Sequence, residues 1–295
     1  MKLNSILAAG LLLLTACSGD DVAEEIVSPT TVNVISCKIT SDESSQTGDL
    51  TWKKRRTAVV SMVKAQSPDV FCTQGQYWNQ VIYLGQQLDE YDYVDYNGDG
   101  NSSVTGYHNT VMYKKDKYTL VKSGRFWLSQ KPTSMTYPWS STDLVYRTAV
   151  WTLLKDNSTN AKFYVVSTEF NDGDETEDID ARLSSSNLLI SQLKSIMDGD
   201  DLPYIIAGEL KASIDSDCLA PLYKNLISAR ESAKSSSSTE SFNGFGDNTA
   251  ASVLNSDHIF ISEGSVEIFK TILDEYDVKY MSEYYPIYSK IKLYE

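Results

Sequence analysis

Strand-like and helix-like segments follow one another in this sequence in an order that allows few folds. The first part reads strand, helix, strand, helix: apolar runs at 31–39 and 69–72 each precede a segment with helical spacing, at 52–65 and 76–88. Several strand-like runs come next without a helix between them, and a second strand, helix, strand order closes the chain. This order predicts an α/β (α+β) fold, a four-layered α-β-β-α sandwich with two mixed sheets packed face to face.

The middle and last parts of the chain supply the other predicted elements. Polar residues at 156–160 predict a hairpin turn, and a serine-rich stretch at 232–241 predicts an exposed loop. The other predicted strands are 91–94, 109–115, 124–129, 147–155, 162–170, 203–210, 257–262 and 290–294, and the other predicted helices are 178–197 and 218–226. No repeat or proline-rich linker divides residues 31–295, which predicts a single domain.

The first residues resemble a bacterial lipoprotein signal peptide. Met1 and Lys2 give a minimal basic start, residues 6–14 form an apolar run too short to cross a bilayer, and the run L-T-A-C ends at Cys17. The resemblance implies that residues 1–16 are removed and that Cys17 is lipidated, which attaches the protein to a membrane through lipid. An ordinary secretory signal peptide with a chance cysteine is the alternative.

The segment after this cysteine is acidic, with Asp20-Asp21 and Glu24-Glu25. It is similar to the acidic export signal of Bacteroidetes-type lipoproteins that reach the outer face of the outer membrane. We therefore expect residues 17–30 to be a flexible tether, and the protein to be an outer-membrane lipoprotein exposed at the cell surface.

An excess of acidic residues restricts the ligands of this chain. It has 40 acidic and 26 basic residues and a formal net charge of −14. Non-specific binding of nucleic acid depends on Lys and Arg that neutralise phosphates, so no nucleic acid is expected as a partner. The basic run at 53–56 is predicted to be the solvated face of an amphipathic helix.

The number and spacing of the cysteines exclude a disulfide framework and a structural zinc cluster. Cys37, Cys72 and Cys218 remain once Cys17 is lipidated, and an odd number without a C-x-x-C pair supports neither a disulfide framework nor a zinc cluster. We expect Cys37 and Cys72, which lie in strand-like runs, to be buried free thiols.

Seven short motifs are spread over nearly the whole chain after the tether. They are W-x3-R at 52–56, SPDVFCTQ at 67–74, YHNTVMYKKDKY at 107–118, RTAVW at 147–151, SFNGFG at 241–246, SDHIFIS at 256–262 and SEYYPI at 282–287. In this order they resemble the endonuclease/exonuclease/phosphatase superfamily, which has the fold of pancreatic deoxyribonuclease. The resemblance implies metal-assisted phosphoester hydrolysis, in which Mg²⁺ polarises the phosphate and a His-Asp pair activates water.

Several positions that carry this chemistry in the family hold other residues here. The Asn that ends the first strand in the family is Lys38, and the metal-binding Glu that follows Gln74 is Gly75. The family motif T-H-x-D reads T-E-F-N, so that Glu169 replaces the phosphate-contacting His and Asn171 replaces the Asp.

The last two motifs depart from the family as well. The motif G-D-x-N reads G-E-L-K, which places Glu209 and Lys211 at its polar positions, and the S-D-H that supplies the catalytic dyad ends in Glu283 and Tyr284. The positions that keep the family residue are Gln74, Asn109, Arg147, Thr168, Gly208, Asp257 and Ser282.

These replacements predict that the chain has lost its catalytic residues and its metal. Tyr284 cannot serve as a base near neutral pH, because tyrosine titrates at about pH 10. Lys38 and Lys211 place two positive charges where a divalent cation would lie, which opposes Mg²⁺ binding. The two histidines, His108 and His258, lie in strand-like runs and are expected to be structural.

We expect the two lysines to form ion pairs with Glu169, Glu209 and Glu283. The resulting prediction is a catalytically degenerate surface lipoprotein without a cofactor, which acts by binding a glycan or a partner protein at the cell surface.

Two other functions stay open on the sequence. The chain could be a metal-dependent phosphodiesterase or phosphatase with a rebuilt, Mg²⁺-binding site formed by Glu169, Glu209, Asp257 and Glu283. It could also be a structural or adhesion subunit.

A calcium loop is a further alternative. Asp95, Asn97 and Asp99 occupy the first, third and fifth positions of an EF-hand-like pattern, but its twelfth position, Gly106, lacks the bidentate Glu. A polar turn between two strands explains the same residues.

Overall fold

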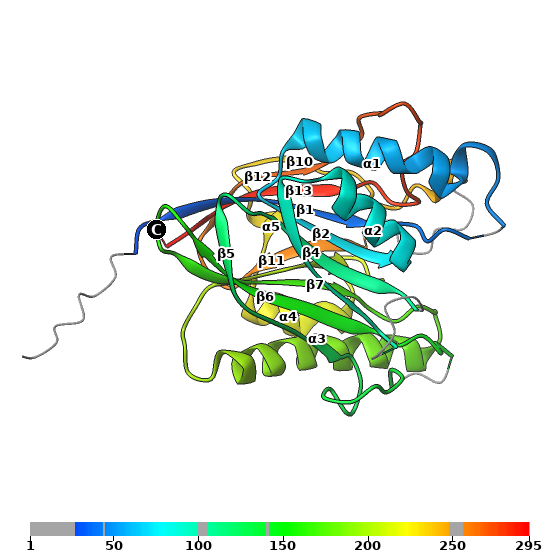
Figure 1. Cartoon of the computed structure of the whole chain (residues 1–295). Coiled ribbons are helices and arrows are strands. Elements are labelled where there is room, and N and C mark those ends of the chain that lie inside the picture. Colours follow the sequence, from blue (N-terminus) through cyan, green and yellow to red (C-terminus); the bar gives the residue numbers. More distant parts are fainter. Residues whose placement is uncertain (1–26, 44, 100–105, 140–141, 248–255, 295) are drawn as a thin grey trace, which may run out of the picture.

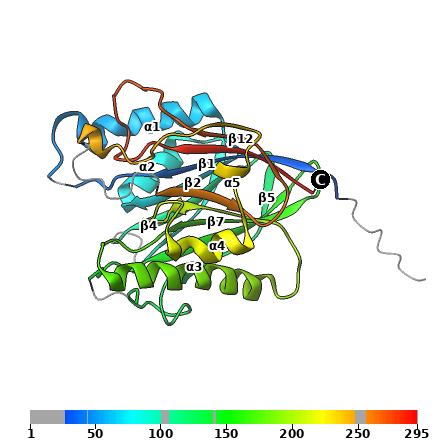
Figure 2. The ribbon, with the colours of Figure 1, turned by 180° about the vertical axis from the view of Figure 1, so that it is seen from behind.

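The computed structural model describes residues 27–43, 45–99, 106–139, 142–247 and 256–294. Two mixed sheets pack face to face, and helices cover the outer face of each sheet (Figures 1 and 2). The four-layered sandwich predicted from the sequence is confirmed. Within the described residues, no helix is both long and apolar enough to span a bilayer.

One sheet has seven strands. Their order across the sheet is β10 (Ser235–Ser237), β12 (Ser265–Thr271), β13 (Ile287–Leu293), β1 (Thr30–Lys38), β2 (Val70–Gln76), β4 (His108–Lys114) and β3 (Tyr91–Asn97). β1 and β2 are parallel, because α1 (Trp52–Gln66) connects them across the outer face. α2 (Trp78–Gln87) lies beside α1 on the same face (Figure 1).

The other sheet has six strands. Their order is β5 (Tyr118–Trp127), β6 (Thr148–Asp156), β7 (Lys162–Glu169), β8 (Tyr204–Glu209), β11 (Asp257–Ile261) and β9 (Ile227–Ser228). β7 and β8 are parallel and are joined by α3 (Thr176–Met197), which covers the outer face together with α4 (Ala220–Asn225) (Figures 1 and 2). The short helix α5 (Ala229–Ser232) follows β9.

Alternating side chains of the strands divide the core into layers. Val34 of β1 and Val165 of β7 belong to the cluster between the two sheets, whereas the neighbouring Ile35 and Val166 belong to clusters under the helices. A strand with both faces covered buries every residue, which explains why these runs read as continuously apolar. Cys37 and Cys72 are buried free thiols, as predicted.

The strand register brings polar residues together at one end of the sandwich. In the six-stranded sheet, Glu169 of β7 pairs with Glu209 of β8, and Glu209 pairs in turn with Asp257 of β11. In the seven-stranded sheet, Lys38 of β1 pairs with Gln74 of β2. These ends of the strands form the candidate site.

The structure corrects two predictions about local structure. The serine-rich stretch 232–241 is not entirely a loop, because β10 lies within it and pairs with β12, a strand that the sequence pattern did not predict. The basic run at the start of α1 is not wholly solvated: Arg55 is completely buried and donates hydrogen bonds to the carbonyl oxygens of Leu50, Thr40 and Met281.

Candidate functional site

Lys38 connects the two sheets at the centre of the site. Its ammonium nitrogen lies 2.9 Å from Oε1 of Glu169 and 3.3 Å from Oε2 of Glu209. Both glutamates are buried, and they come from neighbouring parallel strands of the sheet opposite β1. The predicted ion pairs of Lys38 with these two carboxylates are therefore present.

Two more cations hold the same carboxylates from the sides. Nη1 of Arg147 lies 2.8 Å from Oε1 of Glu169, and Nε of Arg147 donates to Oδ2 of Asp143 at 2.8 Å. Nζ of Lys211 lies 3.0 Å from Oε2 of Glu209 and 3.3 Å from Oδ2 of Asp172. We call the group of Lys38, Arg147, Lys211, Asp143, Glu169, Asp172 and Glu209 the ion-pair cluster.

Opposite charges in the ion-pair cluster offset the effect of burial on Lys38 and Glu169. Burial alone would lower the pKa of Lys38, but the carboxylates of Glu169 and Glu209 raise it well above its ordinary value. Burial would raise the pKa of Glu169, but Lys38 and Arg147 hold it well below its ordinary value. Positive and negative charges thus stabilise one another without any free ion.

Gly75 leaves the space that the ion-pair cluster uses. It lies in a β-bulge of β2 with a φ of +71°, a conformation that favours glycine. A Cβ atom on Gly75 would lie 3.0 Å from Oε2 of Glu169 and 3.3 Å from Cε of Lys38. A longer side chain at position 75, such as the glutamate of the family, would require these two side chains to move.

Tyr284 packs its ring against the lysines. The ammonium nitrogens of Lys38 and Lys211 lie 5.0 Å and 5.8 Å from the centroid of this ring, within the range of a cation–π interaction. Burial and the charge of Glu209 raise the pKa of the Tyr284 hydroxyl above its ordinary value. The residue at the position of the family's histidine is thus a neutral phenol that stabilises cations.

Asp257 is the remaining buried acid of the site. Both of its carboxylate oxygens lack a hydrogen-bond partner within the described residues, and the side chain is 1% exposed. Burial, and then the nearby charge of Glu209, raise its pKa to about 8. Asp257 therefore holds a proton to higher pH than an ordinary aspartate does, whereas the pKa of Glu169 is shifted in the opposite direction.

Like Gly75, Tyr284 and Asp257, three further candidate residues lie outside the ion-pair cluster. Glu283 makes no ion pair within the described residues, so the prediction that it would pair with the lysines is wrong; its backbone N–H donates to Oγ1 of Thr40 instead. Asn109 donates to the carbonyl oxygen of Thr148 at 2.8 Å, across the two sheets. Asn171 donates to the carbonyl oxygens of Asp172 and Asp178, which holds the segment before α3.

A cleft of about 290 Å³ opens onto the ion-pair cluster. Its walls include Lys38, Arg147 and Glu169, and Glu283 lies at its side. Tyr107, also in its wall, stacks on Tyr77 with ring centroids 5.4 Å apart. The cleft is therefore polar, with an aromatic pair beside it.

The residues present do not fit the divalent metal that the fold family implies. The space between Glu169 and Glu209 contains the ammonium of Lys38, which would repel a cation. Across the described ranges, no three His, Cys, Asp or Glu side chains are grouped so that they could hold a metal ion. Two of the candidate carboxylates, Glu169 and Glu209, are engaged with lysine and arginine instead.

The candidate calcium ligands lie mostly in a strand. Asp95 and Asn97 belong to β3, and the carboxylate of Asp95 contacts Nδ1 of His108 at 2.8 Å and accepts a hydrogen bond from Thr110. Residues 100–105 of the candidate loop lie outside the described residues, as do the signal peptide and Cys17.

The two histidines are both buried in strands. His108 contacts Asp95, and Nε2 of His258 lies 2.8 Å from the carbonyl oxygen of Ala212. These contacts agree with the structural role predicted for both.

Sequence reasoning did not identify Asp143 and Asp172 as members of the site, and it treated Arg147 only as scaffold. Asp143 lies four residues before Arg147, and Asp172 follows Asn171 in the altered T-E-F-N motif. The position of Asp143 four residues before Arg147 was an available signal, whereas Asp172 is 39 residues from its partner Lys211 and no local pattern connects them.

Solved structures similar to this one cover nearly the whole chain. An endonuclease/exonuclease/phosphatase family protein from Bacteroides thetaiotaomicron is 23% identical, with a TM-score of 0.82 over 90% of this chain and 98% of that protein. A protein of the same description from Bacteroides vulgatus is 25% identical, with a TM-score of 0.80 over 89% of this chain and 98% of its own.

A third similar structure carries the name of an enzyme. This Bacteroides thetaiotaomicron protein, named mannosyl-6-phosphatase, is 23% identical, with a TM-score of 0.80 over 88% of this chain and 99% of its own. No protein-family model and no curated protein matches the sequence.

Proposed function

The chain has the fold of the endonuclease/exonuclease/phosphatase proteins, and from this premise we propose that it is a non-catalytic protein of that fold which acts by binding. The observation that carries the proposal is the position of Lys38, whose ammonium lies within 3.3 Å of both Glu169 and Glu209. Two side chains that would bind a metal are thereby neutralised by the protein itself.

Three further residues support this proposal because they fit Lys38. Gly75 provides the space for its side chain, the ring of Tyr284 contacts its ammonium, and Arg147 shares its carboxylate partner Glu169. If the site had only lost its metal-binding residues, the remaining buried carboxylates would have no opposite charge beside them. An uncompensated buried charge costs free energy. Here the replaced residues Lys38, Glu169, Glu209 and Lys211 compensate one another's charges.

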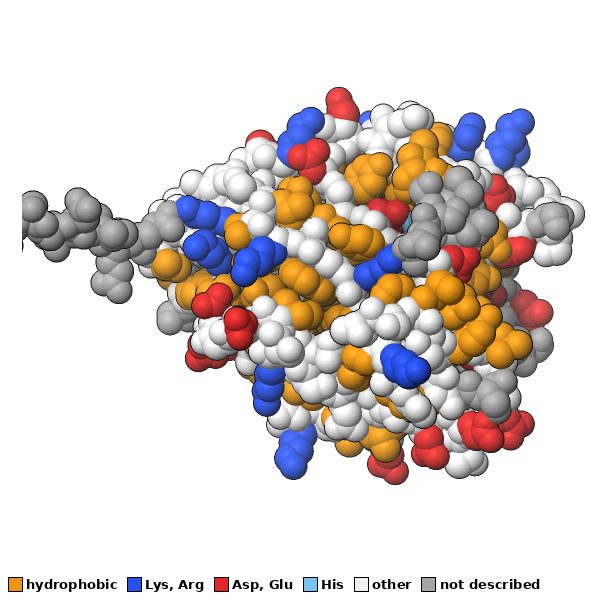
Figure 3. All heavy atoms as spheres, turned by 60° about the horizontal axis from the view of Figure 1, so that its bottom comes forward, with side chains coloured by type: hydrophobic (Ala, Val, Ile, Leu, Met, Phe, Trp, Pro, Cys, Tyr) orange, Lys and Arg blue, Asp and Glu red, His pale blue; other side chains and the backbone are white. Residues whose placement is uncertain are grey.

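The protein would work at the cell surface as a lipoprotein attached through Cys17, with a glycan or a surface protein as its ligand. The acidic composition supports a ligand other than nucleic acid. On the face shown in Figure 3, the coloured Lys and Arg side chains are interspersed with acidic and hydrophobic ones and form no continuous basic surface.

A hydrolase assay with added metal tests the proposal. Purified protein with millimolar Mg²⁺, Mn²⁺ or Ca²⁺ is expected to hydrolyse neither DNA, bis-p-nitrophenyl phosphate nor mannose 6-phosphate faster than buffer. The same ions and EDTA are expected to leave the melting temperature unchanged, because the carboxylates already have partners.

A metal-dependent rate that Glu209→Gln abolishes would overturn the proposal. Glu231→Gln, at an exposed acid of α5, is the matched control that must leave such a rate unchanged. Stabilisation by millimolar Mg²⁺ that disappears in Glu209→Gln would count against the proposal in the same way.

The second candidate function is a phosphoester hydrolase with a rebuilt acidic site. It is favoured by the fold shared with the protein named mannosyl-6-phosphatase, and by Asp257, a buried acid whose pKa of about 8 suits a proton donor near neutral pH. If the chain is a hydrolase, Asp257→Asn should abolish a measurable rate of phosphoester hydrolysis. If it is a non-catalytic binding protein, the wild type should show no such rate.

A further inference from the structure

The segment between β5 and β6 presents large apolar side chains to solvent. Met135, Tyr137 and Leu144 are 49%, 43% and 68% exposed. Asp143 and Arg147, from the same segment, line the cleft over the ion-pair cluster. Exposed apolar side chains beside a concave site are typical of a ligand-binding surface.

Tyr137 packs flat on Tyr146 in this segment. Their ring centroids lie 4.2 Å apart, and the ring planes differ by 6°. The backbone of Gly98 connects this pair to the cleft: its N–H donates to the carbonyl oxygen of Tyr107, and a Cβ atom on it would clash with the carbonyl oxygen of Tyr146. Because Tyr107 belongs to the wall of the cleft, the stacked pair lies beside that wall.

A second stacked pair lies in the wall itself. Tyr107 packs on Tyr77 with ring planes 7° apart, and both residues are half-buried. The hydroxyl of Tyr77 donates to Oε1 of Glu43 at 2.6 Å, which fixes this pair in place. We call Tyr77, Tyr107, Tyr137 and Tyr146 the aromatic rim. Since its rings are already positioned, a ligand that stacks on them orders little of the protein.

Charges of both signs line the cleft beside the aromatic rim. Lys38 and Arg147 supply positive charge, and Asp172 and Glu283 supply negative charge. The side chain of Asp172 is 69% exposed and that of Lys38 is 13% exposed, so both reach solvent. An ionic ligand of either sign would be repelled by one set of these groups. A hydroxyl group avoids this conflict, because it donates to a carboxylate and accepts from an ammonium.

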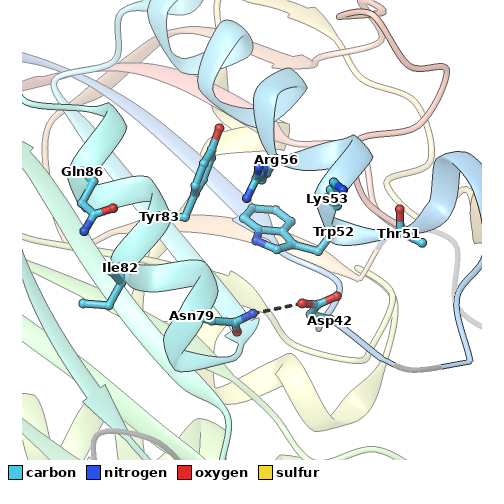
Figure 4. A pocket seen from close by; sticks show the side chains of 9 residues that line it. All are labelled: Asp42, Thr51, Trp52, Lys53, Arg56, Asn79, Ile82, Tyr83 and Gln86. Atoms are coloured by element: carbon cyan, nitrogen blue, oxygen red, sulfur yellow. Dashed lines mark hydrogen bonds between the residues drawn. The ribbon is translucent and has the colours of Figure 1, made fainter.

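A pocket on the outer side of the seven-stranded sheet offers a comparison. Trp52 and Tyr83 line this pocket, which has a volume of about 390 Å³ and lies between α1 and α2 (Figure 4). Trp52 is only 3% exposed and meets Tyr83 edge to face at 5.9 Å. The guanidinium of Arg56 lies 4.6 Å from the centroid of the Tyr83 ring. Tyr83 therefore serves as a control for a half-buried tyrosine outside the cleft.

The cleft lies at the end of the sandwich away from the start of β1. Thr30 pairs with Leu293 at one end, and β1 reaches the ion-pair cluster with Lys38 at the other (Figures 1 and 2). If the chain is anchored through Cys17, the cleft opens away from the membrane. A long polymer could then reach it without hindrance from lipid.

We propose that the cleft and the aromatic rim bind an uncharged oligosaccharide. Sugar rings would stack their C–H faces on Tyr137 and Tyr107, and their hydroxyl groups would bond to the charged groups of the wall. The inference rests on the proposed function and deepens it, because it selects a glycan instead of a surface protein as the ligand.

Isothermal titration calorimetry of the purified protein tests this ligand class. The uncharged probes are the hexasaccharides of glucose in α and in β linkage, of mannose, of xylose and of N-acetylglucosamine. The charged probes are hexagalacturonic acid, which is anionic, and the hexamer of glucosamine, which is cationic. At least one uncharged probe is expected to bind saturably and about tenfold or more tighter than either charged probe, because it is not repelled by charges of either sign.

Three variants assign the binding to the aromatic rim. Tyr137→Ala removes an exposed ring and is expected to weaken binding about fivefold. Tyr107→Leu keeps an apolar side chain in the wall without the flat ring, and a similar loss is expected. Tyr83→Leu makes the same kind of change outside the cleft and should leave the affinity unchanged. Thermal melts verify that each variant is folded.

The inference is wrong if no uncharged probe binds saturably, or if a charged probe binds as tightly as the uncharged ones. It is also wrong if Tyr83→Leu weakens binding as much as Tyr137→Ala does. Should Tyr107→Leu not fold, the comparison of Tyr137→Ala with Tyr83→Leu decides alone.

The metal-dependent hydrolase assay keeps this test apart from that of the proposed function. A protein that shows neither hydrolysis nor oligosaccharide binding would contradict only the present inference. A metal-dependent rate that Glu209→Gln abolishes would contradict the proposed function, whatever the calorimetry shows.

Discussion

A Cβ atom on Gly75 would lie 3.0 Å from Oε2 of Glu169. The glycine lies in the seven-stranded sheet and the glutamate lies in the six-stranded sheet. Two residues far apart in sequence therefore meet closely across the sandwich. The absence of a side chain at position 75 leaves room for Oε2 of this glutamate, whose Oε1 pairs with Lys38 and Arg147.

Replacing this glycine is expected to cost more than its backbone conformation alone explains. Gly75→Ala introduces a side chain at a φ of +71° and a contact tighter than ordinary packing, for an expected loss of about 2 kcal/mol. Gly48→Ala is the control, because Gly48 has a φ of +60° and no atom within 4 Å of its Cβ position. The control is expected to lose about 1 kcal/mol. Equal losses in urea denaturation would show that the space beside Glu169 is not needed.

Removing the ammonium of Lys38 is expected to destabilise the fold. Lys38→Met should lower the free energy of unfolding by about 3 kcal/mol. This value is the low end for a broken buried ion pair, because Arg147 still pairs with Glu169 and Lys211 still pairs with Glu209. Lys122→Met, at an exposed lysine of β5, should change it by less than about 0.5 kcal/mol. Urea denaturation of both variants measures the difference.

A double-mutant cycle checks that Lys38 acts through Glu209. Combining Lys38→Met with Glu209→Gln should recover about 1 kcal/mol or more relative to the sum of the single losses, because the two share one interaction. Additive losses would mean that the two side chains do not interact in solution.

Asp257 is expected to make stability fall as pH rises. Its pKa of about 8 in the folded protein lies above the ordinary value of 3.8, so between these values the folded state holds a proton that the unfolded state has lost. Asp257→Asn has no such proton, and its stability relative to the wild type should rise from about pH 4 to pH 8 and then level off. Thermal melts across this pH range measure the difference in stability between Asp257→Asn and the wild type. A difference that stays constant with pH would contradict the prediction.

Lipid attachment is expected to depend on Cys17. Cys17→Ala should abolish incorporation of labelled palmitate and release the protein from membranes, because one thiol accepts the anchor. Ser18→Ala should behave like the wild type. Palmitate still incorporated into Cys17→Ala would exclude a lipoprotein signal.

The order of the strands and most of their ends could be predicted from the sequence. Continuous apolar runs such as Ile205–Ala207 identify strands that are covered on both faces, and the polar residues that follow them mark the edge where a site forms. Lys38, Glu169, Glu209 and Lys211 could be grouped from the sequence because their motifs resemble those of the endonuclease/exonuclease/phosphatase superfamily.

The parts that the sequence did not reveal depend on contacts between distant segments. Arg55 is buried because three carbonyl groups from separate loops accept its hydrogen bonds, and no local pattern encodes them. β12 is interrupted by a bulge between Val266 and Ile268, which breaks the alternation that identifies a strand. Glu283 lies one residue from Tyr284 yet makes no ion pair within the described residues, because the orientation of a side chain is set by packing.

The salt bridges of Lys38 also have a consequence for how the molecule opens. Lys38 belongs to one sheet, and Glu169 and Glu209 belong to the other, so the sheets cannot separate at this end without exposing three charges to a poorly hydrated gap. We therefore expect partial opening there to cost a free energy close to that of complete unfolding. Backbone amides near the ends of β1, β7 and β8 should exchange their hydrogens with solvent together, at the rate set by unfolding of the whole domain.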